Sequence, residues 1–504
     1  MFKKSIFVTI FVISGALINF FCQVLYGKYF GTGGDMAIYF KMNSIPTMFS
    51  TIFVSIFGSM LIPSFPEYEK KGKFSDFVSY LNPRVKLMAL SVALFGIVYS
   101  VLSVINASSV DHRILLMSVL LWILVYFTIV NGFYSPVINY QKMFYRVSLT
   151  TLMCSGITLV CVFLFHGYLG VLSIPLGMIL GVVIRYILFQ KEVPLKKHHE
   201  TFRLDYKDIG RRALYTMGVM LPFSSFAAIA YSWCGKFDMT GVSYLGYSHS
   251  FEGALSLAAS SGIATVSFPD MAKNLSSSDK ESRRTALCGF SSRIKLVVFI
   301  TSILAVFCAF FCKPVITILL QRGEFSEDST NGLSHVLPFY LVGGSFIALM
   351  NLVRICFYSL KRVKEFSIVA MGVTGLFFLL SHVLVGKIGY VGIGICECVM
   401  WILFFIVSIV ELTVINGSFL TKSFYLDSLK YIVAPILVAV PIRFLYAKLL
   451  EIMMPFPSIV MCGILYLFTV ICVLVYIFRL PEASMYTNRI FAAVFGRFKN
   501  SGNI

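Results

Sequence analysis

Charged residues are scarce in this 504-residue chain: Asp, Glu, Lys and Arg make up 13% of it, against about a quarter of a typical soluble domain. The chain also lacks the Gly/Ser-rich linkers and low-complexity tracts that would separate several soluble domains. Hydrophobic residues account for 58%, and the mean hydropathy is +0.85. These features exclude an ordinary soluble protein. They predict a polytopic membrane protein, since each helical crossing needs roughly 20 apolar residues.

Sequence signatures of common hydrolases are missing as well. The chain contains no P-loop, no HExxH zinc helix and no G-x-S-x-G nucleophile elbow. Most of the twelve cysteines lie inside apolar runs, where a thiol behaves as a small hydrophobic group. His198, His199 and Glu200 share a basic loop that offers no further metal ligands at useful spacing. The sequence therefore predicts no enzyme, no disulfide framework, no metal site and no cofactor.

Acidic residues are outnumbered by basic ones, 23 against 42, which gives a formal net charge of +19. Basic loops of membrane proteins stay on the cytoplasmic side, so we expect both termini and the loop 191–211 to be cytoplasmic. The cytoplasmic location of the basic loops, and their contact with anionic lipid, then explain the positive net charge. Nucleic-acid binding is not needed to explain it. In this arrangement only eight basic residues fall in outer loops: Lys28, Arg113, Lys236, Lys313, Arg322, Lys387, Arg443 and Lys448.

Apolar runs separated by short polar stretches predict an all-α protein with about fourteen transmembrane helices. The runs are bounded by charged, proline-containing or glycine-containing segments. The predicted spans are 5–26, 37–62, 86–106, 114–137, 147–165, 168–190, 212–233, 242–268, 294–312, 334–359, 366–386, 390–412, 429–447 and 458–478.

An internal repeat organises the first twelve spans. The segment 235–270 repeats the segment 27–67: each starts with Gly-Lys-aromatic, continues to Thr-Gly, and ends at Ser-Phe-Pro-acid. The offset at the start maps Lys28 onto Lys236, and further along it maps Lys41 onto His249. Repeats of this kind are the first feature to seek, because they determine the whole fold.

Two further echoes follow in the same order. The motif at 133–135 (Phe-Tyr-Ser) returns at 357–359, and the glycine-bounded motif at 167–171 returns at 389–393. We therefore predict two parallel six-helix lobes with pseudo-two-fold symmetry along the membrane normal. The N-lobe covers 1–190, a cytoplasmic linker 191–211, the C-lobe 212–412, and 413–504 supplies two further helices and a tail. Transporters built this way usually carry their substrate between the lobes and rock one lobe against the other.

Ionisable side chains inside predicted spans are costly and point to function. Lys41 lies near the outer end of its span and either contacts substrate or extends to the interface. His249 and Glu252 are three apart on one helix face, in a cavity or as a local structural pair. Glu397 either couples an ion or makes a structural hydrogen bond. The candidate substrate-binding residues are Lys28, Lys41, Lys236, His249 and Glu252, and the candidate ion-coupling residues are Glu397 and Asn351.

Three motifs resemble the MurJ/MviN family of lipid II flippases, within the multidrug/oligosaccharidyl-lipid/polysaccharide (MOP) exporters. They are Tyr-Phe-Gly-Thr-Gly at 29–33, Ile-Pro-Ser-Phe-Pro-Glu-Tyr at 62–68, and Leu-Gln-Arg-Gly-Glu-Phe at 320–325. The resemblance implies a fourteen-helix flippase whose cavity arginines bind a pyrophosphate. Aligned through the motifs, those arginine positions fall on four residues that are not basic: Ala16, Cys22, Thr51 and Ser250. Either the lysines and His249 named above replace them, or the headgroup differs.

The sequence thus favours a flippase of the bacterial inner membrane. It would move a polyprenyl-pyrophosphate-linked saccharide, either lipid II or a polysaccharide repeat unit, to the outer leaflet by alternating access. Expected partners are the lipid-linked substrate, membrane lipids, and a polysaccharide polymerase or cell-wall synthesis machinery. A Na⁺ or H⁺ gradient would supply the energy. The alternative is a cation-coupled exporter of small amphipathic drugs, which would use acidic cavity residues such as Glu252 and Glu397.

Overall fold

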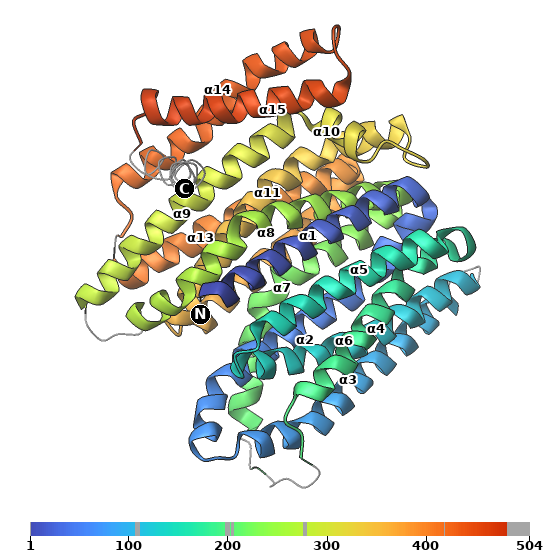
Figure 1. The fold of residues 1–504 in the computed structure, drawn as a ribbon, viewed down its shortest axis with the longest axis vertical. Coiled ribbons are helices and arrows are strands. Elements are labelled where there is room, and N and C mark those ends of the chain that lie inside the picture. The colour runs from blue at the N-terminus through green and yellow to red at the C-terminus, as the bar shows by residue number, and fades with distance from the viewer. Residues whose placement is uncertain are drawn as a thin grey trace, which may run out of the picture. The chain divides into compact units, whose positions relative to one another are not determined.

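The computed structural model describes residues 2–105, 111–196, 202, 206–275, 280–417 and 419–480, and this part of the chain contains helices and no strand (Figure 1). Each predicted span overlaps one long helix, although the span 168–190 begins in the last turn of α5 and the span 458–478 continues from α15 into η2. The short α10 is an addition that the sequence did not predict. The helices are α1 (Phe2–Phe30), α2 (Gly34–Lys70), α3 (Phe74–Ile105), α4 (His112–Tyr140), α5 (Phe144–Leu169), η1 (Gly170–Leu172), α6 (Ser173–Glu192), α7 (Tyr206–Phe237), α8 (Met239–Leu275), α9 (Lys280–Phe310), α10 (Cys312–Leu319), α11 (Glu327–Ser359), α12 (Val363–Ile388), α13 (Tyr390–Asn416), α14 (Lys422–Leu449), α15 (Pro455–Cys472) and η2 (Val473–Ile477).

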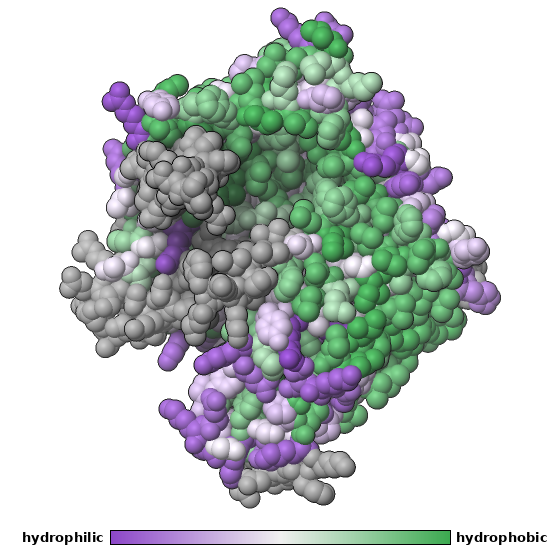
Figure 2. Space-filling model, in the orientation of Figure 1, coloured by the Kyte–Doolittle hydropathy of each residue, from purple (hydrophilic) through white to green (hydrophobic). Residues whose placement is uncertain are grey.

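Lipid-facing surfaces are evident on these helices. Within the described residues, ten helical stretches are long and apolar enough to cross a membrane. On α3, Leu87, Leu94 and Phe95 each leave more than half of their surface exposed, which suits contact with lipid rather than water. On the face shown in Figure 2, hydrophobic side chains form a broad continuous area, and hydrophilic ones gather at its edges. The all-α membrane class is confirmed, and the number of fourteen crossings stays a prediction.

Contacts divide the chain into two compact units. The first comprises Met1–Ala254, Leu320–Val336 and Arg362–Phe404. In it α1 packs on α5, α2 on α4 and α7, α4 on α3 and α6, and α7 on α12. The middle of α4 supplies much of one hydrophobic core cluster of this unit, in which Phe133 and Tyr134 are fully buried. This unit holds every candidate site residue except Asn351.

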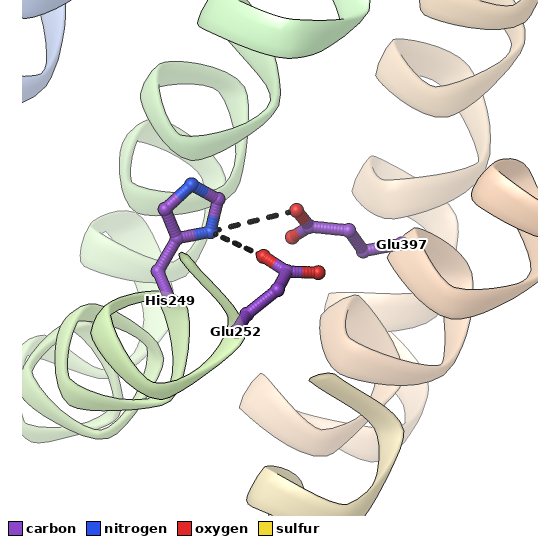
Figure 3. Close-up of side chains that lie close together, drawn as sticks. All are labelled: His249, Glu252 and Glu397. Carbon is purple, nitrogen blue, oxygen red and sulfur yellow. Dashed lines mark ion pairs between the residues drawn. The ribbon is translucent and has the colours of Figure 1, made fainter. Parts of the chain in front are cut away.

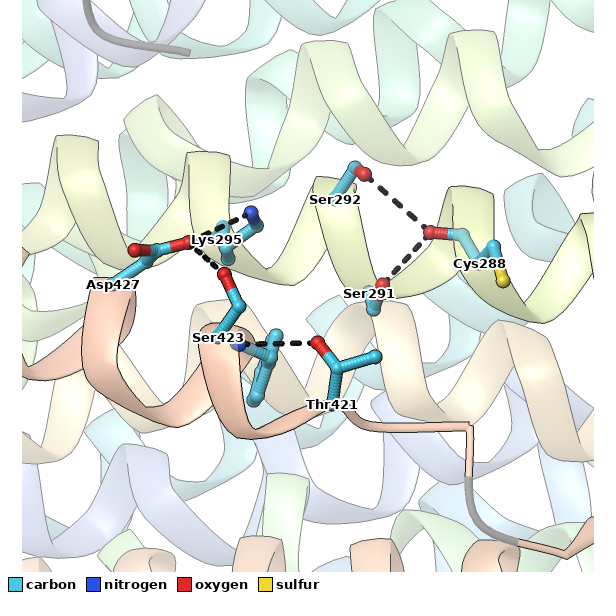
Figure 4. Close-up of polar contacts among 8 residues, drawn as sticks. Cys288, Ser291, Ser292, Lys295, Thr421, Ser423 and Asp427 are labelled. Carbon is cyan, nitrogen blue, oxygen red and sulfur yellow. Dashed lines mark hydrogen bonds and ion pairs between the residues drawn. The ribbon is translucent and has the colours of Figure 1, made fainter. Parts of the chain in front are cut away.

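The second unit comprises Leu255–Leu319, Leu337–Lys361 and Phe405–Ile504. Its core joins α9 to α14 and α15. Lys295 of α9 lies 3.4 Å from an Asp427 carboxylate oxygen of α14, and the Thr421 hydroxyl caps the first turn of α14 (Figure 4). The units cut across α8, α11 and α13, so the predicted lobe boundaries at 190 and 412 stay predictions.

The internal repeat reappears in the helix geometry, with a corrected register. The helices α5 and α12 both have 26 residues, and each ends at a glycine with positive φ, 54° at Gly170 and 68° at Gly389. The turns before them carry Lys142 and Lys361, also with positive φ. Gly170 therefore corresponds to Gly389, whereas the sequence had paired 167 with 389. The left-handed cap is the decisive feature, because a residue without Cβ adopts it without strain.

The same correction applies to the second helix of each copy. The helix α2 begins at Gly34 and α8 at Met239, and alignment of these two starts places Ser44, not Lys41, opposite His249. Short apolar motifs can shift by about one helical turn and keep the same buried face, because side chains three and four apart lie on one face. Helix ends fix the register that such motifs leave open.

Candidate functional site

The structure brings three of the predicted residues together on α8 and α13. His249 Nδ1 lies 3.1 Å from Glu252 Oε2 and 3.6 Å from Glu397 Oε1 (Figure 3). Spacing on α8 explains the first contact, since residues three apart share one helix face. The second contact crosses to α13, eight residues beyond the Gly389 cap. We call His249, Glu252 and Glu397 the acidic triad.

Burial makes the charge of this triad significant. The side chains of Glu252 and Glu397 are each 1% exposed, whereas that of His249 is 34% exposed. Two carboxylates in one buried site cannot both stay ionised without compensating positive charge. A protonated His249 supplies one positive charge. The second negative charge needs a further proton, a bound cation or another positive group nearby. Such a cluster is able to take up a cation, and its more exposed member is His249.

The geometry also allows all three residues to serve as ligands of one ion. Their ligand atoms lie within 4.8 Å of one another. Glu252 Oε1 is buried and has no hydrogen-bond partner among the described residues, which leaves a lone pair directed at any ion held there. Carboxylate oxygens suit Na⁺ or H⁺, and the imidazole nitrogen adds affinity for transition metals. The sequence paired His249 with Glu252 and named Glu397 separately, so it did not predict the three-residue cluster. The loop at 198–200 that it considered for metal binding lies outside the described residues.

The predicted lysines lie elsewhere in the first unit. Lys41 is half-buried on α2 and reaches α7, where a Cβ built on Gly235 would lie 3.1 Å from its Nζ. Lys236 is exposed and rests over the ring of Trp233, 4.3 Å from the ring centroid. Lys28 is exposed as well. These cations are available to an anionic ligand, and their substrate-binding role stays a prediction.

Asn351 belongs to a different polar group, in the second unit. Its amide nitrogen donates to Ser260 Oγ at 3.3 Å, and its Oδ1 accepts from Arg354 Nη2 at 3.3 Å. The side chain thus has a structural hydrogen-bonding role between α11 and α8. Its predicted role in ion coupling has no support from these contacts and stays a prediction.

Two of the motifs that carry the family resemblance meet in the structure. The amide of Glu324 donates to the carbonyl of Lys28 at 2.9 Å. Gly31 and Gly323 both have positive φ, 59° and 61°. A Cβ on Gly323 would lie 2.2 Å from the Lys28 carbonyl oxygen, and one on Gly31 would lie 2.4 Å from that of Glu324. Only glycine permits this approach at both places. We call Lys28, Gly31, Gly323 and Glu324 the glycine latch.

Further hydrogen bonds join the same segments. Tyr247 of α8 donates to the carbonyl of Gly31 at 2.8 Å, and the hydroxyls of Thr32 and Ser329 lie 2.7 Å apart. The latch therefore joins the α1–α2 turn to α8 and to the loop before α11. Sequence reasoning quoted both motifs and missed their contact, although two unexplained glycines in polar turns were the available signal.

Comparison with known proteins decides the family. A sequence model described as "Lipid II flippase MurJ" matches residues 26–469. The chain belongs to the MurJ family. This family member is 23% identical over 377 residues to the "Probable lipid II flippase MurJ" of Aquifex aeolicus, covering 72% of this chain and 73% of that protein. It is 21% identical over 408 residues to the "Lipid II flippase MurJ" of Thermosipho africanus, covering 79% and 83%.

Solved structures share the fold. A structure titled "Lipid II flippase MurJ, inward closed conformation" superposes with a TM-score of 0.75 at 18% identity, covering 93% of this chain and 99% of that one. An inward-facing MATE multidrug transporter of the MOP superfamily superposes with a TM-score of 0.62 at 14% identity, covering 80% and 96%. The predicted family and membrane fold are confirmed. The chain is a multi-pass protein of the bacterial inner membrane, and a transporter rather than an enzyme.

Proposed function

We propose that this protein is a flippase that moves a polyprenyl-pyrophosphate-linked saccharide from the inner to the outer leaflet. The family match over residues 26–469 carries the proposal. It favours this function over export of small amphipathic drugs, because the similarity to MATE transporters, at 14% identity, concerns the fold alone. The substrate is lipid II or a related repeat unit, and the product serves cell-wall or surface polysaccharide synthesis, next to a polymerase or cell-wall synthesis machinery.

Alternating access requires an end that closes and reopens. The excess of basic residues on the opposite side assigns the glycine latch to the outer end of the helices and both termini to the cytoplasm. Its contacts are backbone hydrogen bonds and hydroxyl pairs, which separate at modest cost once water replaces them. This arrangement suits a gate that opens once per transport cycle.

The acidic triad supplies the coupling step in this proposal. Its two buried carboxylates and His249 take up a proton or Na⁺ and release it when their surroundings change. Lys28, Lys41 and Lys236 contact the pyrophosphate, which stays negatively charged throughout the crossing and needs cationic partners in a medium of low dielectric constant. In this proposal the acidic triad takes up the coupling cation, and the three lysines bind and release the pyrophosphate.

Reconstituted vesicles test the function. Purified protein is incorporated into liposomes with fluorescent lipid II or with a fluorescent polyprenyl-pyrophosphate disaccharide, and a membrane-impermeant quencher reports transfer between leaflets. We expect transfer well above that of protein-free vesicles for at least one of the two lipids. Background rates for both, together with cation-dependent uptake of an amphipathic dye, would favour the drug-exporter alternative.

Orientation is tested separately in cells. A cysteine at Ser326, which is exposed beside the latch, should react with an impermeant maleimide added outside. A cysteine at Ser282 should react only after permeabilisation. The opposite pattern would reverse the topology and place the latch at the cytoplasmic end.

A further inference from the structure

A polar cavity lies inside the first unit, apart from the acidic triad. It has a volume of about 450 Å³ and is lined by α1, α2, α4, α5 and α6. Small-molecule pockets span about 300–1,000 Å³, so the cavity has room for a sugar ring. Asn19 and Thr47 are exposed at its mouth, whereas Tyr26, Tyr39 and Thr158 are buried. The remaining lining residues are Gln23, Asn43, Pro46, Ser50, Thr51, Leu124, Val125, Thr128, Cys154, Ser155, Met178 and Val182.

None of the lining residues is acidic, basic or a histidine, which disfavours a charged ligand. A buried charge without a partner costs several kcal/mol. Arg185 lies one turn beyond Val182 on α6 and is engaged elsewhere, because it donates to Ser135 Oγ at 3.2 Å and lies over the ring of Phe189. The cavity therefore suits an uncharged polar molecule.

Hydrogen bonds within the helices decide which partner the cavity prefers. The hydroxyls of Thr128 and Thr158 donate to carbonyls of their own helices, at 2.8 and 3.0 Å, and Ser50 does the same at 3.0 Å. Each hydroxyl has then used its one donor and keeps acceptor lone pairs. Gln23 Oε1 is buried and accepts no hydrogen bond from the described residues. The cavity thus offers these hydroxyl acceptors together with the amide donors of Asn19, Gln23 and Asn43, which suits a ligand rich in hydroxyls, since a hydroxyl both donates and accepts.

Two tyrosines add aromatic surface to the lining. The rings of Tyr26 and Tyr39 lie 6.4 Å apart and are nearly edge to face. An aromatic face packs against the apolar C–H face of a pyranose ring, while the surrounding acceptors receive its hydroxyls. We propose that this cavity binds one uncharged hydroxylated sugar unit of the transported saccharide. That the sugar belongs to the transported saccharide rests on the proposed flippase function. That the cavity binds an uncharged hydroxylated ring rests on the lining residues alone.

A series of sugars that differ in charge tests the proposal. Full-length protein in nanodiscs is titrated with glucose, glucuronate and protonated glucosamine at mildly acidic pH, with saturation-transfer NMR as the readout. The three rings have similar size, so charge is the main variable. We expect saturable transfer to glucose and at least about tenfold weaker binding of the other two, because the cavity offers neither ion a partner.

Two matched variants locate the binding. Thr158→Val keeps the side-chain volume and removes the hydroxyl, and should weaken glucose binding about five- to tenfold, the effect of one hydrogen bond. Thr150→Val is the control, because Thr150 is also buried on α5 and bonded to its own helix but does not line the cavity. Gln23→Leu should weaken binding to a similar degree.

Three results would overturn the proposal. Absence of saturable binding for every sugar would show that the cavity serves helix packing only. Glucuronate binding as tightly as glucose would point to Arg185 instead. Equal binding by Thr158→Val and Thr150→Val would place the sugar elsewhere. Flipping of the lipid-linked saccharide without any sugar binding in the cavity would reject this inference and leave the proposed function intact. Sugar binding in the cavity without flipping would reject the proposed function and leave the sugar site intact.

Discussion

Aligned on the starts of α2 and α8 and on the glycine caps of α5 and α12, the two copies of the repeat place different chemistry at corresponding positions. Glu252 corresponds to Thr47, and Glu397 to Met178. Thr47 and Met178 line the neutral cavity, whereas the two glutamates form the acidic triad with His249. The duplicated backbone therefore holds an uncharged cavity in one copy and a buried cluster of two carboxyl groups and an imidazole in the other.

This difference shows that the same helix arrangement can hold side chains of different charge. Equal helix lengths and two left-handed glycine caps preserve the frame in both copies. The frame depends on caps and apolar packing, which are satisfied whichever polar groups face the interior. A few substitutions at inward positions then decide whether that interior attracts a neutral sugar or a cation. A duplicated transporter can thereby assign substrate contact and ion coupling to different copies.

The largest effect is expected from Lys41, the only charged residue of α2 between Asp35 and Glu67. Lys41 points to α7 at Gly235 rather than lining the neutral cavity. Lys41→Ala should reduce flipping to the protein-free background, because the pyrophosphate loses a permanent cationic partner. Lys41→Arg should keep much of the activity. His249→Ala should also weaken flipping, because the acidic triad loses its imidazole. A normal rate for Lys41→Gln would reject the anion-binding role of Lys41, and a normal rate for His249→Ala would reject a role of the triad in coupling.

Neutralising the acidic triad should have the next largest effect. Glu397→Gln keeps the shape and removes one ionisable carboxyl, and should change flipping about 5- to 150-fold at a fixed cation gradient, the usual range of coupling between two sites. The pH or Na⁺ dependence should flatten as well, and Glu252→Gln should impair transport with normal expression. Glu365→Gln is the control, since Glu365 pairs with Arg362 at a helix end. Unaltered ion dependence in both triad variants would assign Glu252 and Glu397 a structural role.

A charge transplanted into the neutral copy tests whether the cavity tolerates ions. Met178→Glu places a carboxyl at the position corresponding to Glu397 but without an imidazole beside it among the lining residues. We expect destabilisation by several kcal/mol, seen as a lower thermal unfolding temperature in nanodiscs. Met178→Gln should unfold close to the parent temperature. Equal unfolding temperatures for the Glu and Gln variants would mean that the two copies offer similar electrostatic surroundings.

The smallest expected effect concerns the turns that join the first two helices of each copy. The α1–α2 turn contains Gly31 with positive φ, whereas Asp238 occupies the α7–α8 turn. Gly31→Ala should open the latch, because strain of this kind costs about 1–3 kcal/mol. Hydrogen exchange of the Glu324 amide, which bonds to Lys28, should accelerate roughly tenfold.

Gly34→Ala is the matched control for this measurement. A Cβ built on Gly34 meets no atom within 4 Å, so the exchange rate of the Glu324 amide should stay as in the parent protein. Equal exchange in the Gly31 and Gly34 variants would show that the close approach of the two turns is not what holds this end closed.

Sequence alone determined the membrane class, the approximate position of the long helices and the identity of the buried glutamates. These features depend on local properties: apolar runs long enough to span a bilayer, and the cost of placing a charge within them. The family motifs were visible for the same reason, since each is a short continuous segment. The pairing of His249 with Glu252 also follows from helical spacing.

Tertiary structure decided which of these residues meet. Glu397 joins His249 only because α13 packs with a particular rotation beside α8, and the Gly31 turn meets Glu324 only after the loop before α11 folds over it. The repeat register was fixed by glycine caps, and the neutral cavity by side chains from five helices. A helix can turn or slide by one residue without changing its own hydropathy, so contacts between helices are set by their mutual packing and not by any one segment.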